Sequence, residues 1–116
     1  MADFAEIRLD NNEVIRIVKI SDVDVAAHGG NLSEEAENWV SNFIPNDLDL
    51  LEKKFNNIYP KTYWKQTFKD HSHRKNFAFV GGLYYPEHDG FAMKCPVPEE
   101  INLWNFNTTT WLWEKI

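Results

Sequence analysis

Alternation of apolar and charged residues near the start of the chain predicts a β-hairpin. Residues 4–9 alternate between the two kinds, which indicates a strand with one buried face. An Asx-rich turn at 10–12 leads into 13–20, a second run rich in branched residues. Because residues 15–18 are apolar on both faces, we expect this second strand to be central in its sheet.

Two stretches between residues 33 and 56 show helical spacing instead. Ser33 or Asn31 can cap a helix whose first turn carries three glutamates, which are favourable at the positive end of a helix. Its apolar positions recur every three or four residues and predict a buried stripe made of Ala36, Trp39, Val40, Phe43 and Ile44. Pro45 ends this helix, and a second short helix is predicted over 47–56.

Strand patterns return after residue 62. Polar turns at 70–73 and 86–90 and a glycine pair at 81–82 break this part of the chain into short pieces. The pieces are rich in aromatic and branched residues, and they predict strands at 63–68, 75–80, 83–85 and 91–93.

Four aromatic rings near the end of the chain predict a surface that has to be covered. After an extended connector at 96–98, residues 103–114 have the pattern of a hairpin with its loop at 107–110. We expect Phe106 opposite Trp111 and Trp104 opposite Trp113, which places all four rings on one face. The domain's own sheet can cover this face, or a neighbouring subunit can, since Trp is a typical interface anchor. We therefore predict a partner interface at Trp104, Phe106, Trp111 and Trp113.

These elements together predict an α+β fold, a mostly antiparallel β-sheet of hairpins with one or two short helices inserted between residues 33 and 56. The 116 residues suffice for one core, so we expect a single domain over 1–116. With 43% hydrophobic and 26% charged residues, the composition is that of a globular protein.

Charge and hydropathy narrow the range of partners. The net charge of −6 argues against a nucleic-acid partner, because phosphate binding depends on Lys and Arg. No apolar run is long enough to span a bilayer and the start is not a leader, so we expect a protein made in the cytoplasm without a membrane partner. The single cysteine, Cys95, cannot form an internal disulfide, and we expect a reduced, buried thiol.

No pattern predicts catalysis, a metal or a cofactor. His71 and His73 could share a zinc ion on a strand, but no third ligand has a diagnostic spacing, so we interpret them as polar turn residues. Cys95 has no helix start behind it to activate the thiol. His88 and Asp89 lie at the tip of a Pro/Gly turn, exposed to water. We therefore expect a protein that is not an enzyme.

Arg74 is a further candidate interface residue. It stands in a turn with two histidines and Lys75, so several cationic groups crowd together in an acidic protein. Because a guanidinium suits contact with a carboxylate, we expect Arg74 to pair with one, within the chain or across an interface. A solvated turn is the alternative.

Short motifs along the chain resemble those of a family of small proteins from tailed phages, many with marine or cyanobacterial hosts. The resemblance covers most of the chain outside residues 21–62, with Pro86 where the family pattern has Asp and with longer helices at 33–56. The motifs that carry it are Phe4-Ala5-Glu6-Ile7, Asp10-Asn11-Asn12, Val14-Ile15-Arg16-Ile17-Val18, Trp64-Lys65-Gln66-Thr67, Arg74-Lys75-Asn76-Phe77-Ala78, Gly81-Gly82, Tyr84-Tyr85, Asp89-Gly90-Phe91, Pro96-Val97-Pro98, Trp104 and Trp111.

The resemblance implies a structural protein of the virion, made in the host cytoplasm. Capsid decoration, or cement, is the first expectation, and a minor head, neck or tail component is the next. Its partners would be the major capsid protein, neck or tail subunits, or further copies of itself. The alternative is a phage-encoded intracellular effector that binds a host protein, for which the acidic charge suits competition for basic surfaces. A small metal-dependent enzyme would rest on His71 and His73 alone.

Overall fold

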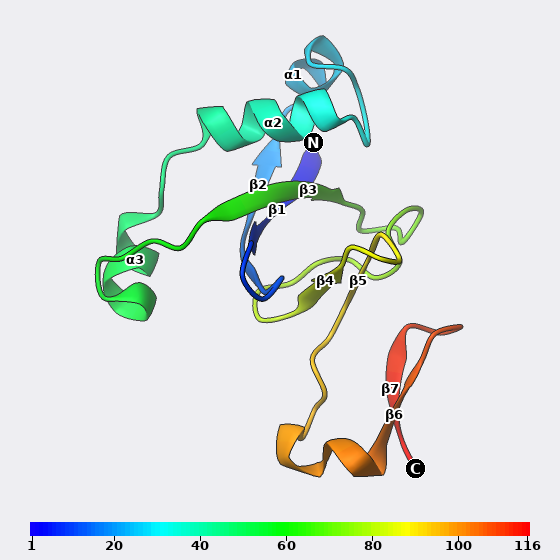
Figure 1. The fold of residues 1–116 in the computed structure, drawn as a ribbon. Coiled ribbons are helices and arrows are strands. Elements are labelled where there is room, and N and C mark those ends of the chain that lie inside the picture. The colour runs from blue at the N-terminus through cyan, green and yellow to red at the C-terminus, as the bar shows by residue number, and fades with distance from the viewer.

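Three strands form the main sheet of the protein, which we describe over residues 1–116 from a computed structural model (Figure 1). β1 (Ala2–Arg8) pairs antiparallel with both β2 (Val14–Ile20) and β3 (Thr62–Thr67), which gives the order β2-β1-β3. The hairpin is as predicted, but β2 is an edge strand and β1 is central. The prediction of a central β2 is wrong because β3, which follows far along the chain, adds to the free edge of β1.

β1 is buried on both faces, not on one as predicted. Its side chains contribute alternately to two apolar clusters, one on each side of the sheet. The first cluster contains Ala2, Phe4, Ile20, Val25, Ala36, Val40 and Trp64. The second contains Ala5, Ile7, Val14, Ala78, Tyr84 and Phe91.

Two helices cover the face of the first cluster. α1 (Asp22–Ala27) was not predicted, although Ser21 caps it by accepting a hydrogen bond from the backbone of Asp24. α2 (Glu34–Phe43) begins after Ser33, one of its two predicted caps. Its predicted stripe is only partly buried, since Phe43 at the end of the helix is 62% exposed and stacks on Trp39 instead of entering the core.

A short hairpin and its flanking loop cover the opposite face. β4 (Leu83–Tyr85) pairs antiparallel with β5 (Gly90–Ala92), as the sequence predicts. The predicted strand at 75–80 is absent, and only Lys75 forms an isolated bridge, to Phe91. The reason lies in the backbone: Arg74 and Lys75 both have left-handed φ angles, +58° and +67°, which interrupt an extended chain.

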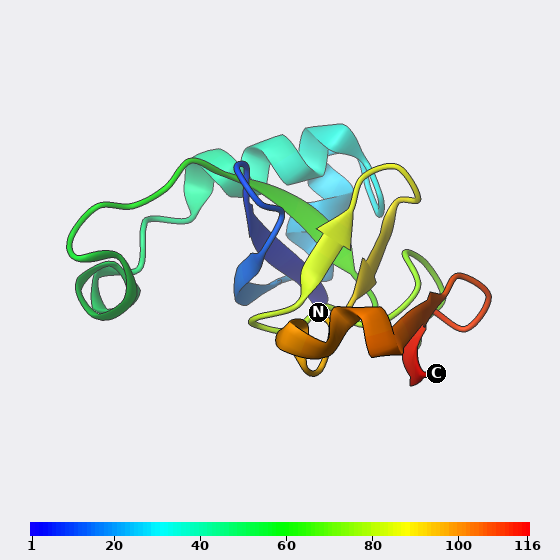
Figure 2. The same cartoon turned by 60° about the horizontal axis from the view of Figure 1, so that its bottom comes forward.

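The remaining elements project from this layered body (Figures 1 and 2). α3 (Leu48–Phe55) is the second predicted helix, capped by Asp47, and none of its residues is buried. The C-terminal segment holds a 3-10 helix, η1 (Pro98–Leu103), and a hairpin of β6 (Trp104–Asn107) and β7 (Leu112–Lys115). We refer to residues 98–116 as the C-terminal arm. The four helices and seven antiparallel strands make up the predicted α+β fold, with 26% helix and 31% strand.

These projections make the molecule open for its size. The radius of gyration of the Cα atoms is 15.1 Å, whereas a compact domain of this length has about 13.4 Å. The accessible surface is 7162 Å², against about 6600 Å² for a compact monomer of 13.7 kDa. Apolar side chains that are at least half exposed mark both projections: Leu48 and Ile58 near α3, and Ile101, Leu103, Leu112 and Ile116 on the C-terminal arm.

Candidate functional site

The four predicted interface rings lie on the C-terminal arm, in a register that differs from the prediction. Phe106 pairs opposite Trp113, and Trp104 pairs opposite Lys115. The rings of Trp104, Phe106 and Trp113 therefore share one face of the hairpin. Trp111 is not in a strand, and it reaches the same group from the turn, with its ring 5.4 Å from that of Phe106.

The turn of this hairpin explains the change of register. The side-chain oxygen of Asn107 accepts hydrogen bonds from the backbone N–H groups of Thr109 and Thr110, at 2.8 and 3.2 Å. The backbone oxygen of Asn107 accepts another from the N–H of Trp111, at 2.7 Å. Trp111 also has a φ of +59°, a turn conformation. The loop therefore spans residues 108–111 and includes Trp111, shifted by one residue from the predicted 107–110.

Trp111 anchors the arm to the body. It is only 4% exposed, and its ring meets those of Tyr85 and His88 edge-on at 5.6 and 5.4 Å. The Lys75 ammonium lies 5.6 Å from the ring centre, in cation–π position. A Cβ atom at Gly90 would lie 3.1 Å from the indole and 2.5 Å from Lys75 Cγ, so a glycine is needed for this fit. We call Lys75, Tyr85, His88 and Gly90 the Trp111 seat.

Few other polar contacts hold the arm. The Asn76 side chain donates hydrogen bonds to the backbone oxygens of Trp111 and Phe91, at 2.9 and 3.2 Å. The Trp113 indole donates to the backbone oxygen of Met93 at 2.8 Å. The arm is thus fastened mainly at its turn.

The rest of the aromatic face is less well covered. Trp104, Phe106 and Trp113 are half-buried, and Phe106 stacks on Tyr85 at 5.6 Å. The indole N–H of Trp104 is buried without a hydrogen-bond partner. Such an unsatisfied donor costs roughly 1–3 kcal/mol.

Arg74 pairs with carboxylates inside the chain, as predicted, and lies apart from the aromatic face. Its Nη1 atom donates to Glu37 at 2.6 Å and to the backbone oxygen of Gln66 at 3.1 Å. Its Nε atom lies 3.0 Å from Asp89 Oδ1, an ion pair without hydrogen-bond alignment. Because the Arg74 side chain is 7% exposed, little of it is available to a partner. It links α2 to the β4–β5 turn.

The network continues through Tyr84, whose hydroxyl hydrogen-bonds to Asp89. Burial raises the pKa of Tyr84, and the Asp89 carboxylate raises it further. Glu37 also accepts a hydrogen bond from the backbone N–H of Gln66 at 2.9 Å, so this buried carboxylate has several partners. Together these contacts hold α2, β3 and the β4–β5 turn to one another, which is a structural role.

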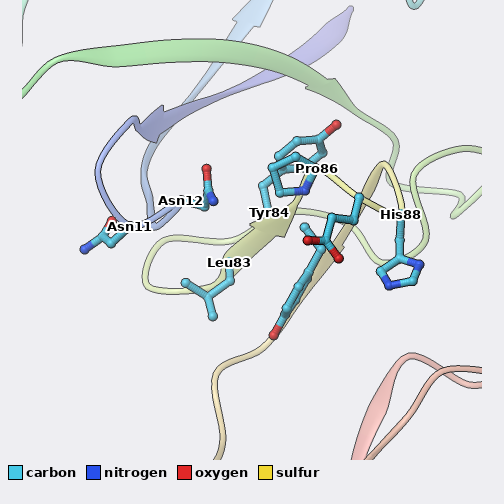
Figure 3. Close-up of a pocket in the computed structure, with 8 residues that line it drawn as sticks. Asn11, Asn12, Leu83, Tyr84, Pro86 and His88 are labelled. Carbon is cyan, nitrogen blue, oxygen red and sulfur yellow. The ribbon is translucent and has the colours of Figure 1, made fainter.

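An open hollow of about 280 Å³ lies beside the arm, over β4 and the β1–β2 turn (Figure 3). Figure 3 shows that Leu83 and Tyr84 point to opposite sides of β4, so the side chains around the hollow do not converge on one point. The amide oxygen of Asn11 accepts from the backbone N–H of Glu13, and that of Asn12 accepts from the Tyr63 hydroxyl. The side-chain oxygens of both asparagines are therefore already engaged within the chain.

The histidines and the cysteine are dispersed. His71 has a left-handed φ of +60° in an exposed turn, so it does not share a strand face with His73. Nowhere do three or more His, Cys, Asp or Glu side chains gather closely enough to hold a metal ion. Cys95 is a buried free thiol, as predicted, and donates to the backbone oxygen of Val97.

Two residues with a role in these contacts were missed in the sequence: Gly90 beside Trp111, and Glu37 beside Arg74. Gly90 was recognised as a turn residue, but no local signal indicates which ring a glycine will accommodate. Glu37 follows Ala36 and stands three residues before Val40, so it lies at the border of the predicted stripe. Its burial could have been suspected from that spacing, but its partner Arg74 could not.

Comparisons with other proteins leave this geometry as the main guide to function. Neither a scan against protein-family models nor searches among curated proteins and solved structures found a match. None of the helices combines the length and apolar character needed to cross a membrane.

Proposed function

We propose that this protein is a non-enzymatic, protein-binding component of a phage particle that binds its partner through the C-terminal arm. The supporting observation is the arm itself. It carries Ile101, Leu103, Leu112 and Ile116 at least half exposed, next to a half-buried aromatic face, and it is fastened to the body mainly by Trp111. Exposed apolar surface of this kind is typical of interaction sites.

The amount of excess surface suits such a role. The protein exposes about 600 Å² more than a compact monomer of its mass. A specific interface buries about 800 Å² on each partner, so this excess is of the right order. Tryptophans at its centre would supply anchor energy.

The assignment to a phage particle rests on the sequence motifs that resemble small virion proteins. Within the particle, we propose capsid decoration or cement first, and a minor head, neck or tail component next. The partners would be the major capsid protein, or neck or tail subunits. Binding of a host protein inside the infected cell is the second candidate, and the net charge of −6 favours basic partner surfaces.

Mass spectrometry of purified particles tests this proposal. We expect the protein in particles of the phage that encodes it, in a fixed ratio to the major capsid protein. Its absence from particles, together with co-purification of one host protein from infected cells, would replace the virion role with the effector role.

A further inference from the structure

We propose that two copies of this protein exchange their C-terminal arms, so that the Trp111 of each copy occupies the seat of the other. The inference deepens the proposed function, on which it rests for the binding role of the arm, and it names a second copy of the chain as one partner. It follows from three features: the hinge before the arm, the seat, and the apolar residues around the hinge.

The hinge consists of residues 93–97. No backbone–backbone hydrogen bond joins it to the body, and its own carbonyl at Val97 bonds forward into the arm. Pro96, and Pro98 just after it, favour extended backbone at the residues that precede them. Five extended residues span roughly 17 Å, enough to carry the arm away from its own body.

The exchange needs no new contacts at the Trp111 seat. Every contact of Trp111 with Lys75, Tyr85, His88 and Gly90 would be reproduced when the indole comes from a second copy. Exchange of an identical element conserves these contacts and is therefore an economical route to a dimer.

The hinge region supplies the additional contact that favours the dimer. Met93, in the hinge, and Ile101 and Leu103, in the part of the arm that follows it, are 51%, 53% and 50% exposed. When two arms cross about a twofold axis, the two hinges run past each other and these side chains meet their copies. Glu99 and Glu100 of both copies also approach there, so the dimer should tighten as salt screens their repulsion.

Isotope mixing tests the exchange with the unmodified full chain. Equal amounts of unlabelled and ¹⁵N-labelled protein are unfolded and refolded together, the dimer is isolated, and amine–carboxylate cross-links are mapped between the seat segment 85–91 and the arm. If the arms are exchanged, half of the cross-linked pairs of seat segment and arm should join a ¹⁵N-labelled segment to an unlabelled one. If all pairs carry a single label, or if the protein stays monomeric up to about 1 mM by sedimentation, the proposal is overturned.

Complementary variants provide a second test. Gly90→Leu closes the seat and leaves Trp111 in place, whereas Trp111→Ala leaves the seat open. Mixed together, the two should form a heterodimer by native mass spectrometry, because the arm of the first fits the body of the second. Gly90→Leu mixed with the double variant Gly90→Leu/Trp111→Ala is the matched control and should form none.

Folded single variants that form no heterodimer would overturn the exchange. If the variants do not fold, the isotope experiment decides alone. Particle composition is measured independently, so a failed exchange and a failed virion role give different results.

Discussion

Arg74 and Glu37 form the best-protected ion pair of the protein, with side chains 7% and 5% exposed. Arg74→Ala would leave the buried Glu37 carboxylate without its closest cation. We expect a loss of about 3–5 kcal/mol in the free energy of unfolding, which lowers Tm by about 10 °C or more. A thermal unfolding scan measures this loss.

Lys65→Ala is the matched control for Arg74. Lys65 Nζ lies 3.4 Å from the same Glu37, but its side chain is 29% exposed. Removing an ion pair that water already screens should cost less than about 1 kcal/mol. Equal losses in the two variants would show that Arg74 does not hold the buried carboxylate.

All four tyrosines of the chain have raised pKa values. Burial raises the pKa of Tyr63 to about 12. The folded protein should therefore show little phenolate absorbance at 295 nm at pH 10, where an exposed tyrosine is half ionised. Because the unfolded chain loses these protons first, the stabilisation is complete below about pH 10 and is lost as the pH rises toward 12.

Tyr63→Phe tests the assignment to a single residue. This variant should lose about a quarter of the total absorbance change and show a smaller decline in stability between pH 10 and 12, since one of four groups is removed. A native titration with its midpoint near pH 10 would contradict the burial of these hydroxyls.

The docking of the β6–β7 hairpin depends on the space at Gly90. In Gly90→Leu, we expect the hairpin to detach, with faster amide exchange in β6 and β7 and red-shifted tryptophan emission, while exchange in β1 stays unchanged. Leu112→Ala, next to Trp111 but exposed, should leave both readouts unchanged. If hairpin exchange is the same in Gly90→Leu and the unmodified protein, Trp111 is not the anchor.

Local sequence patterns predicted most elements but not how they associate. The hairpin of β1 and β2, the helix after Ser33, the second helix within 47–56 and the pair β4–β5 follow from spacing and turn residues. The central place of β1 depends on pairing with β3, which no local pattern contains. The false strand at 75–80 had the right composition, but the left-handed residues before it break the extension.

The sequence predicted which aromatic residues form the candidate site, but not how they are arranged. Alternation correctly placed Trp104, Phe106 and Trp113 on one face of a hairpin. The three hydrogen bonds to Asn107 stabilise a turn that is shifted by one residue, to 108–111, and Trp111 is therefore the anchor and not a strand residue. Its seat on the body is a long-range contact that the arm sequence does not encode.

The openness of the whole molecule is measurable in solution. Small-angle scattering of the dilute monomer should give a radius of gyration near 15 Å or slightly above, because both α3 and the C-terminal arm project from the body. A value near 13.4 Å would mean that the projections fold back on the body. Exposed apolar surface would then no longer support a binding role.

Incorporation into particles tests arm-mediated binding most directly. The double variant Leu112→Ser/Ile116→Ser removes apolar surface from the arm, and Val23→Ser/Val80→Ser removes exposed apolar side chains elsewhere as a matched control. Both should melt like the unmodified protein. We expect at least a roughly tenfold loss of the arm variant from purified particles, which corresponds to about 1.4 kcal/mol, and no loss of the control. Equal incorporation of the two variants would contradict binding through the arm.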